Sequence, residues 1–430
     1  MWEPKKFAIV VVMVGFLALL GARGAIAGGL ELREQGAAAI GMSDAVTSKL
    51  DHPSTVYFNP AGMAFLEGLQ VSAGATFVMP QFGYRDPEGN HPSASNTNKV
   101  LTPPHFYASW RISEQFATGL SFNVPFGLGL QWPSDFGGRH MTVGSEMQIF
   151  LINPNFAYRP FESLSIAVGL QLMPGTVEIE RRFGFVTDEG RISEGGVELG
   201  GLGFGIGANF GVMYRPLDWL NLGFFYRSRV AMTFYGDAHF DVPAGVGDRS
   251  VFHDQSVEAS VVLPDYMVIG IGFQVLPELY LAFDLDIVLW SSVDNIGIRF
   301  PNDQSGQLTE DVRQDWRDTV TPRLGIEWRA LDLPLHRLIV RFGGGYDMPP
   351  TPDHTLSPML PDSHRIFTST GLGYTYKPFG LTFDVGYMMT NFLPRTVGRD
   401  DCRDDYCNPF PAEYKTRVHL LAVDLSWQIF

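Results

Sequence analysis

Residues Leu279 to Leu289 carry the sequence LYLAFDLDIVL, and this stretch decides the fold. Every odd position in it is apolar, whereas the even positions include Asp284 and Asp286. A repeat of two residues is the spacing at which a β-strand turns successive side chains to opposite faces of a sheet. The stretch therefore predicts a strand with one apolar face and one face that carries carboxylates.

The same alternation recurs along the chain, for example from Leu381 to Met389 and from Leu421 to Gln428. About fourteen such segments begin near Leu69, Phe106, Phe116, Met147, Leu164, Leu202, Leu220, Val257, Leu279, Trp316, Leu338, Arg365, Leu381 and Tyr414. Bacterial single-chain membrane barrels have an even number of strands. Closure matters because an open sheet edge in lipid leaves backbone groups unsatisfied at several kcal/mol each.

Two all-β architectures fit this alternation, a water-soluble sandwich and a transmembrane barrel. The alternating runs match the ~9–11 residues of a tilted membrane strand better than the ~5–6 of a soluble strand. Aromatic residues that suit the two membrane interfaces end several apolar faces, namely Trp219, Trp290, Trp328 and Trp427. The chain also stops at Phe430 directly after a strand, as exported barrel proteins do. We therefore predict a transmembrane antiparallel β-barrel whose apolar rows face lipid.

Composition narrows the function classes. The 430 residues carry a net charge of −15, and no basic stripe offers itself to nucleic acid. Cys402 and Cys407 are the two cysteines, and in an exported protein we expect them to form a disulfide that staples a loop. The alternative for this Asp-rich loop is a calcium site, but its spacing lacks the calcium-loop pattern and the turn glycine. We expect neither a metal nor a cofactor.

The N-terminus predicts export. Lys5 and Lys6 precede an apolar stretch from Phe7 to Leu20, and a small-residue site ends at Ala27. This is the order of parts in a secretory signal peptide, which we expect to be residues 1–27. The alternative, a membrane anchor, is weaker because the apolar stretch is shorter than the ~20 residues that a spanning helix needs.

Residues 28–67 precede the first expected strand, are rich in Gly, Ala and Ser, and show no clean alternation. An apolar cluster surrounds the motif Phe58, Asn59, Pro60, Ala61 and Gly62. A flexible periplasmic tail would expose this cluster to water, whereas a plug inside the barrel would bury it. We therefore predict a hatch at residues 28–67 and the barrel at residues 68–430.

Several motifs resemble the FadL family of outer-membrane transporters of hydrophobic compounds, which has toluene and xylene members. They are Gly29 to Leu32, Gly36 to Ala45, Phe58 to Gly62, Asn123 to Gly127, Trp316 to Thr319, Pro322 to Gly325 and Leu360 to Arg365. Their order and spacing carry the resemblance over nearly the whole mature chain. It implies a fourteen-stranded barrel plugged by its hatch, a groove formed by long outer loops, an internal pocket, and release sideways through a gap in the wall.

The stretch Asn123, Val124, Pro125, Phe126 and Gly127 is our candidate for that gap. Proline within a strand removes a backbone donor and bends or interrupts the pairing. The alternative is that the strand simply ends there at a turn. The family resemblance favours the wall opening.

A pocket for a fatty acid needs apolar walls and one or two cations at one end. Alternation from Trp316 to Arg329 sends Arg317 and Arg323 inward, and Arg317 resembles a head-group position of the fatty-acid transporters. The shared face of Val177 and Phe183 places Arg182 inside as well. The alternative for each arginine is pairing with a lumenal carboxylate that merely neutralises charge.

These observations predict passive transport of hydrophobic molecules, with long-chain fatty acids as the first choice and aromatic hydrocarbons as the alternative. We expect a monomer in the outer membrane of a Gram-negative bacterium, in contact with its lipid and lipopolysaccharide, and no enzymatic activity. Two rivals of other classes are a lipid hydrolase and a general porin. Against the hydrolase, the sequence contains no G-x-S-x-G turn and no His/Cys/Asp cluster with metal spacing.

Overall fold

The computed structural model describes residues 29–97, 100–246, 252–303, 306, 308–404, 406–408 and 410–429. The predicted signal peptide, residues 1–27, and the terminal Phe430 lie outside the described residues.

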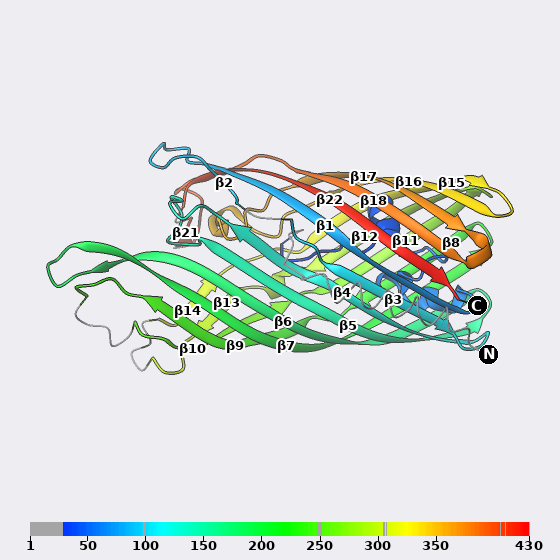
Figure 1. The fold of residues 1–430 in the computed structure, drawn as a ribbon, viewed down its shortest axis with the longest axis horizontal. Coiled ribbons are helices and arrows are strands. Elements are labelled where there is room, and N and C mark those ends of the chain that lie inside the picture. The colour runs from blue at the N-terminus through cyan, green and yellow to red at the C-terminus, as the bar shows by residue number, and fades with distance from the viewer. Residues whose placement is uncertain are drawn as a thin grey trace.

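One antiparallel sheet closes on itself into a barrel of fourteen spanning strands, as predicted (Figure 1). The spanning strands are β1 (Leu69–Arg85), β3 (Pro104–Arg111), β4 (Phe116–Gln131), β5 (Gly144–Phe161), β6 (Leu164–Val186), β7 (Ile192–Leu217), β8 (Leu220–Arg227) continued by β9 (Val230–Asp241), β10 (Gln255–Leu263) continued by β11 (Asp265–Leu276), β12 (Leu279–Leu289), β15 (Thr319–Asp332), β16 (His336–Asp347), β17 (Arg365–Tyr376), β18 (Leu381–Phe392) and β22 (Ala412–Gln428). Strand β1 pairs with β22 from Gln70 opposite Gln428 to Arg85 opposite Glu413, which closes the ring.

Shorter elements lie in the connections. They are β2 (Ala94–Ser95), η2 (Trp290–Ser292), β13 (Asn295–Arg299), β14 (Glu310–Arg313), η3 (Asp353–Thr355), η4 (Lys377–Phe379), β19 (Arg395–Val397), β20 (Cys402–Arg403) and β21 (Tyr406–Cys407). A disulfide joins Cys402 to Cys407. Strands β6, β7 and β9 extend farther than most of their neighbours at one end of the barrel (Figure 1).

The two faces of the wall are arranged as predicted, with apolar side chains outside and polar ones inside. On β12, Phe283 is exposed, whereas Asp284 and Asp286 are buried in the lumen. On β6, Val168 and Leu170 are exposed. The outside of the spanning region therefore suits lipid, and the carboxylates point inward, where they find partners.

Two of the four tryptophans expected at the membrane interfaces depart from that prediction. Trp219 and Trp328 are exposed, but Trp290 and Trp427 are buried. Trp290 begins η2 and packs edge-to-face against Trp316, with ring centroids 5.0 Å apart. Trp427 is covered because its indole N–H donates to the carbonyl of Phe379 in η4. Alternation along one strand does not show which loops fold back over its end.

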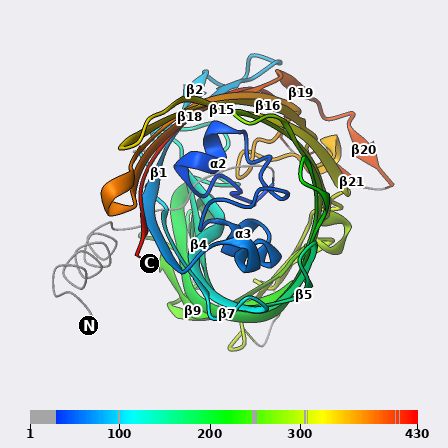
Figure 2. The same ribbon diagram turned by 90° about the vertical axis from the view of Figure 1, so that its right-hand side faces the viewer.

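The hatch, residues 29–66, lies inside the ring of strands (Figure 2). It contains α2 (Ala37–Gly41), α3 (Thr55–Phe58) and η1 (Pro60–Phe65), all of them almost completely buried. Helix α2 packs directly on β17, where a side chain on Gly41 would meet the backbone of Gly371 at 3.0 Å. Glycine is required at this close approach. Among the described residues, no helix combines the length and the apolarity needed to cross a bilayer.

Buried ion pairs tie the hatch to the wall. Lys49 pairs with Glu327 of β15 at 2.9 Å, and Arg33 pairs with Asp286 of β12 at 2.9 Å. The backbone N–H of Ala37 donates to Asp424 of β22 at 2.7 Å. The hatch is therefore held on several sides of the lumen. Removal of one partner of a buried ion pair would leave the other charge buried and unpaired, which destabilises the contact.

Candidate functional site

A β-bulge interrupts β4 at the predicted position. The pairing of β4 with β5 shifts between Asn123 and Phe126, where Val124 and Pro125 together oppose the single residue Phe150, so β4 contains one extra residue at that point. A slip of one residue turns all later side chains to the other face of the sheet. Accordingly, Leu120 before the bulge is exposed, whereas Phe126 and Leu128 after it are buried inside the barrel.

Beyond the bulge, the other edge of β4 loses its barrel partner. Strand β3 pairs with β4 only from Phe106 opposite Phe122 to Arg111 opposite Ala117. Farther along, the edge of β4 carries backbone groups that need partners in a membrane protein. The wall therefore has an open strand edge next to Pro125.

Residues 30–32 of the hatch, here called the edge segment, occupy that edge as a short antiparallel strand. The N–H of Leu32 donates to the carbonyl of Pro125 at 2.8 Å, and the N–H of Gly127 donates to the carbonyl of Leu30 at 2.9 Å. Glu31 therefore lies opposite Phe126. Gln35 extends the contact, because its amide donates to the carbonyl of Val124 at 2.9 Å and accepts from the N–H of Val124 at 3.3 Å.

A cavity with mainly apolar walls lies beside the edge segment. Its walls come from β4, β5, β6, β7, β9, β10 and β13, from the edge segment and from the connections that follow β14 and η3. The lining residues are Leu30, Leu128, Ser145, Glu146, Met147, Val177, Glu178, Ile179, Leu199, Gly200, Gly201, Phe234, Val257, Ala259, Ser260, Val261, Ile296, Ile298, Gln314, Trp316, Ser357, Met359 and Leu360. Among the described residues, none that lines it is Arg, Lys or His.

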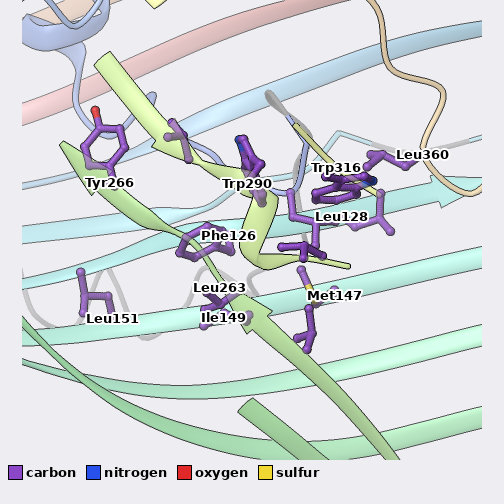
Figure 3. Close-up of a cluster of buried hydrophobic side chains, with 14 of the residues drawn as sticks. Phe126, Leu128, Met147, Ile149, Leu151, Leu263, Tyr266, Trp290, Trp316 and Leu360 are labelled. Atoms are coloured by element: carbon purple, nitrogen blue, oxygen red, sulfur yellow. The ribbon is translucent and has the colours of Figure 1, made fainter. Parts of the chain in front are cut away.

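The cavity belongs to one continuous cluster of buried apolar side chains. Figure 3 shows Trp316 and Leu360 at one end of this cluster and Tyr266 at the other, with Phe126 and Ile149 between them in this view. Leu30 belongs to the same cluster. An apolar molecule in the cavity would therefore touch the edge segment directly.

Connections outside the spanning strands cover the cavity. The ring of His354 lies 2.9 Å from Asp315, and the Asn408 side chain donates to the carbonyl of Leu356 at 2.9 Å. Partial desolvation alone would raise the pKa of Asp315, but hydrogen bonds from His354 and Arg313 outweigh it and lower that pKa. Since Asn408 directly follows Cys407, the disulfide lies close to the contacts that hold this cover in place.

A second, charged cavity lies on the other side of the edge segment, where Glu31 and Arg33 line it together with residues of β12 and β15 to β22. Arg323, one of the head-group candidates, is buried here. It donates to Asp286 at 2.7 Å and to the carbonyl of Ser43 at 3.2 Å. Arg365 pairs with Asp347 at 2.6 Å. The charges of both arginines are thus already balanced.

The expected inward direction of Arg182 is wrong. Arg182 lies on the same face of β6 as Val168 and Leu170, outside the barrel, and pairs with Glu180 at 3.0 Å and Asp241 at 3.3 Å. Beyond the lipid-facing rows, the apolar residues of β6 point inward and line the cavity. The polar residues between them must then point outward, which is the reverse of the arrangement in the membrane.

The expected inward direction of Arg317 is also wrong. Strand β15 begins at Thr319, so Arg317 lies in the preceding connection, where its side chain is exposed. Its backbone N–H donates to the carbonyl of Pro350 at 2.9 Å. The two-residue repeat therefore says nothing about its direction. Of the three head-group candidates, Arg323 alone faces the lumen.

Arg227 and Tyr266 are not among the residues predicted from the sequence, and they oppose each other on β8 and β11. Arg227 is 4% exposed, and its guanidinium lies 4.6 Å from the ring centroid of Tyr57, 5.3 Å from that of Phe225 and 5.9 Å from that of Tyr266. A signal was present, because alternation with the outward Leu222 and Phe224 places Arg227 inside.

The hatch motif takes part in holding this region together. The Asn59 side chain donates to the carbonyl of Thr47 at 3.0 Å and to the carbonyl of Val212 on β7 at 3.0 Å. It also caps η1 by accepting from the N–H of Ala61 at 3.3 Å. Pro60 and Gly62 follow as buried residues of η1, and Phe58 packs edge-to-face against Tyr57 at 5.0 Å. The motif thus fixes the base of the hatch to the wall.

Comparison with known proteins agrees with this architecture. Residues 18–428 match the family described as outer membrane protein transport protein (OMPP1/FadL/TodX). Outer membrane protein P1 of Haemophilus influenzae is 24% identical over 412 residues, which cover 86% of this chain and 87% of that protein. The long-chain fatty acid transport protein of Escherichia coli (strain K12) is 23% identical over 381 residues, which cover 79% of this chain and 82% of that protein.

Solved structures show the same fold. A Pseudomonas aeruginosa FadL homologue superimposes with a TM-score of 0.82 at 18% identity, covering 94% of this chain and all (100%) of that chain. The toluene transporter TodX of Pseudomonas putida superimposes with a TM-score of 0.70 at 16% identity, covering 90% and 98%. Together with the match over residues 18–428, these findings show that the chain belongs to the OMPP1/FadL/TodX family of outer-membrane transporters of hydrophobic compounds.

Proposed function

We propose that this transporter carries long-chain fatty acids passively, through the apolar cavity and out of the wall at Pro125. The observation that carries the proposal is the position of the edge segment. Leu30 lines the cavity, and its carbonyl accepts a hydrogen bond from Gly127 on the open edge of β4. One movement of residues 30–32 would therefore open the cavity and the wall together.

The energy of this contact suits a reversible gate. Two backbone hydrogen bonds and the two from Gln35 join the edge segment and its neighbour to β4. Each typically contributes about 0.5–1.5 kcal/mol net. Binding of a hydrophobic ligand offers several kcal/mol, because buried apolar surface is worth roughly 25 cal/mol per Å². Ligand binding alone can therefore shift the gate.

A disulfide between positions 31 and 126 tests the gate. Glu31 and Phe126 form a pair that is not hydrogen-bonded to each other, and such pairs bring Cα atoms to about 4.5 Å, within the usual disulfide range. The double variant Glu31→Cys/Phe126→Cys should take up a labelled fatty acid when reduced and lose uptake when oxidised. Heat-modifiable migration on gels would show that the barrel remains folded.

Controls separate the new disulfide from other effects. Each single cysteine variant should keep its uptake in both redox states. The unmodified chain, which has its own Cys402–Cys407 disulfide, should respond to the same treatment without loss. Undiminished uptake by fully cross-linked protein would refute the lateral route at Pro125.

Aromatic hydrocarbons are the second candidate substrate. The observation that favours them is the lining of the apolar cavity, in which the described residues include two glutamates and no cationic side chain. A carboxylate head group bound inside this cavity would find no cation there. Competition between toluene and a fatty acid for binding to the purified protein distinguishes the two substrates.

Two assays test the rivals of other classes. A general porin conducts ions steadily in planar bilayers, whereas a lumen filled by the hatch should conduct little. A lipid hydrolase would release fatty acid from an ester substrate, and we expect no release. We also propose that the protein acts as a monomer surrounded by outer-membrane lipid and lipopolysaccharide, since apolar side chains are exposed on widely separated strands, including β6 and β12.

A further inference from the structure

Arg227 differs from the other buried arginines of the lumen in having no ionic partner. Among the described residues, no carboxylate lies within 4.0 Å of its guanidinium. By contrast, Arg33 lies 2.9 Å from Asp286, and Arg341 lies 2.6 Å from Asp384. A buried guanidinium without a counter-ion within contact distance is costly, so an anion that entered this place would be bound favourably.

Two polar atoms at this place are unsatisfied. Within the described part of the chain, Nε of Arg227 and the hydroxyl of Tyr266 are buried and have no hydrogen-bond partner. The one hydrogen bond of the guanidinium is a long contact of 3.5 Å to the hydroxyl of Tyr57. Two unused donors on facing strands are what a carboxylate with two oxygens requires.

The space for such a group is the space that the Glu31 side chain now takes. Arg227, Tyr57 and Tyr266 line a small, narrow cavity, in itself hardly larger than a water molecule, that Glu31 of the edge segment lines as well. Desolvation raises the pKa of Glu31 to about 7. The protein's own carboxylate is thus poorly stabilised in its present position, although it lies beside the same cavity.

The small cavity and the apolar cavity lie on either side of the edge segment. Leu30 faces the apolar cavity and Glu31 faces the small one, as alternation along an extended segment requires. Tyr266 belongs to the same apolar cluster as the cavity walls and marks its far end in Figure 3. A ligand with a polar head and a long tail would bridge the two cavities once the edge segment moves.

We propose that Arg227 and Tyr266 bind the carboxylate head of the transported ligand, which takes the place of Glu31 in the small cavity. This rests on the proposed function and deepens it, because it assigns two residues of the lumen to the carboxylate head of the substrate. The ligand tail fills the apolar cavity and displaces Leu30. The head displaces Glu31, and the edge segment leaves β4.

Binding of oleic acid and oleyl alcohol to the purified protein at pH 8 tests this site, because the two share one tail and differ in head-group charge. In neutral detergent, the unmodified protein should bind the acid about tenfold more tightly, the effect expected of a hydrogen-bonded charged group. Arg227→Met should remove this preference while keeping the affinity for the alcohol. Arg227→Lys should restore part of it, and Tyr266→Phe should reduce it.

The controls use arginines that the structure places away from both cavities. Arg182→Met and Arg317→Met should keep the preference for the acid. Acetate and chloride serve as short anions, and if they compete with oleyl alcohol as strongly as with oleic acid, a free anion rather than a ligand head occupies the site. Equal affinities in the unmodified protein, or a preference that survives Arg227→Met, would overturn the proposal. If neither oleic acid nor oleyl alcohol binds the unmodified protein, the proposed transport function itself fails.

Discussion

Gln35 offers the most direct test of the edge segment, because its buried side chain replaces a missing strand partner. Its amide satisfies both the N–H and the carbonyl of Val124 at the bulge. The substitution Gln35→Ala leaves these two buried backbone groups without partners. Each unsatisfied buried group costs roughly 1–3 kcal/mol. Because water that enters the bulge can partly replace the lost partner, we expect a cost of about 2 kcal/mol for the N–H and the carbonyl of Val124 together. That corresponds to roughly a thirtyfold shift toward the undocked edge segment.

Hydrogen exchange measures this shift. The amides of Leu32 and Gly127 donate across the contact, so they exchange only when the edge segment opens. In Gln35→Ala we expect both amides to exchange roughly 30-fold faster, since exchange follows the opening equilibrium. The control is Gln70→Ala, because the Gln70 side chain is half-buried and bonds only to the nearby carbonyl of Glu67. Unchanged protection of Leu32 and Gly127 in Gln35→Ala would refute the argument that these bonds hold the gate.

Three further predictions follow from the same geometry. Glu327→Ala leaves buried Lys49 with Asp51 and buried Arg341 with Asp384 as their remaining carboxylates, and should lower the free energy of unfolding by roughly 1–3 kcal/mol in urea titrations, because charged hydrogen bonds are lost. Because docking raises the pKa of Glu31 from its ordinary value to about 7, docking is strongest at pH values below that ordinary value and weakens as pH rises toward 7, as a spin label on the edge segment would report. Glu31→Gln should abolish that dependence, and its persistence would exclude Glu31 as the cause. Ala259→Trp should fill the apolar cavity and lower ligand affinity at least tenfold, whereas Ala231→Trp on the exposed face of β9 should not; equal binding by both would place the ligand elsewhere.

Much of the barrel could be predicted because lipid imposes one rule on every spanning strand. The alternation from Leu279 to Leu289 gave the bounds of β12, and six further strands begin at the residue expected. The rule fails where a strand changes its surroundings. Pro264 separates β10 from β11, and two residues separate β8 from β9, although each pair serves as one wall strand. Alternation alone does not reveal such breaks, because the two parts of each wall strand lie between the same neighbouring strands.

The errors at Arg182 and Arg317 have different physical origins. The inward prediction for Arg182 requires that apolar residues face lipid along the whole of β6. That strand continues beyond the lipid, where its apolar face packs inward around the cavity. Arg317 was placed by extending the alternation beyond the start of β15. In both cases the alternation shows which residues share a face. It does not show what each face of the sheet contacts, because that depends on distant parts of the chain.

Pro125 shows how far local information reaches. Proline within a strand pattern predicted an interruption, and the bulge lies there. The partner of the open edge, however, comes from residues 30–32, about ninety residues earlier in the sequence. Such a contact is set by how the hatch folds inside the finished barrel. The same is true of Arg227, whose inward direction follows from alternation, whereas its lack of an ionic partner depends on which hatch side chains reach it.

The edge segment couples three events that would otherwise be independent. Its backbone completes the wall at β4, Leu30 closes one side of the apolar cavity, and Glu31 lies at the small cavity of Arg227. A ligand can shift this equilibrium only by as much as its affinity differs between the docked and undocked states. On the proposed mechanism, a purely apolar ligand would compete with Leu30 alone, whereas a fatty acid would compete with Leu30 and Glu31 together. The longer the tail that accompanies a carboxylate, the more completely its binding should open the wall.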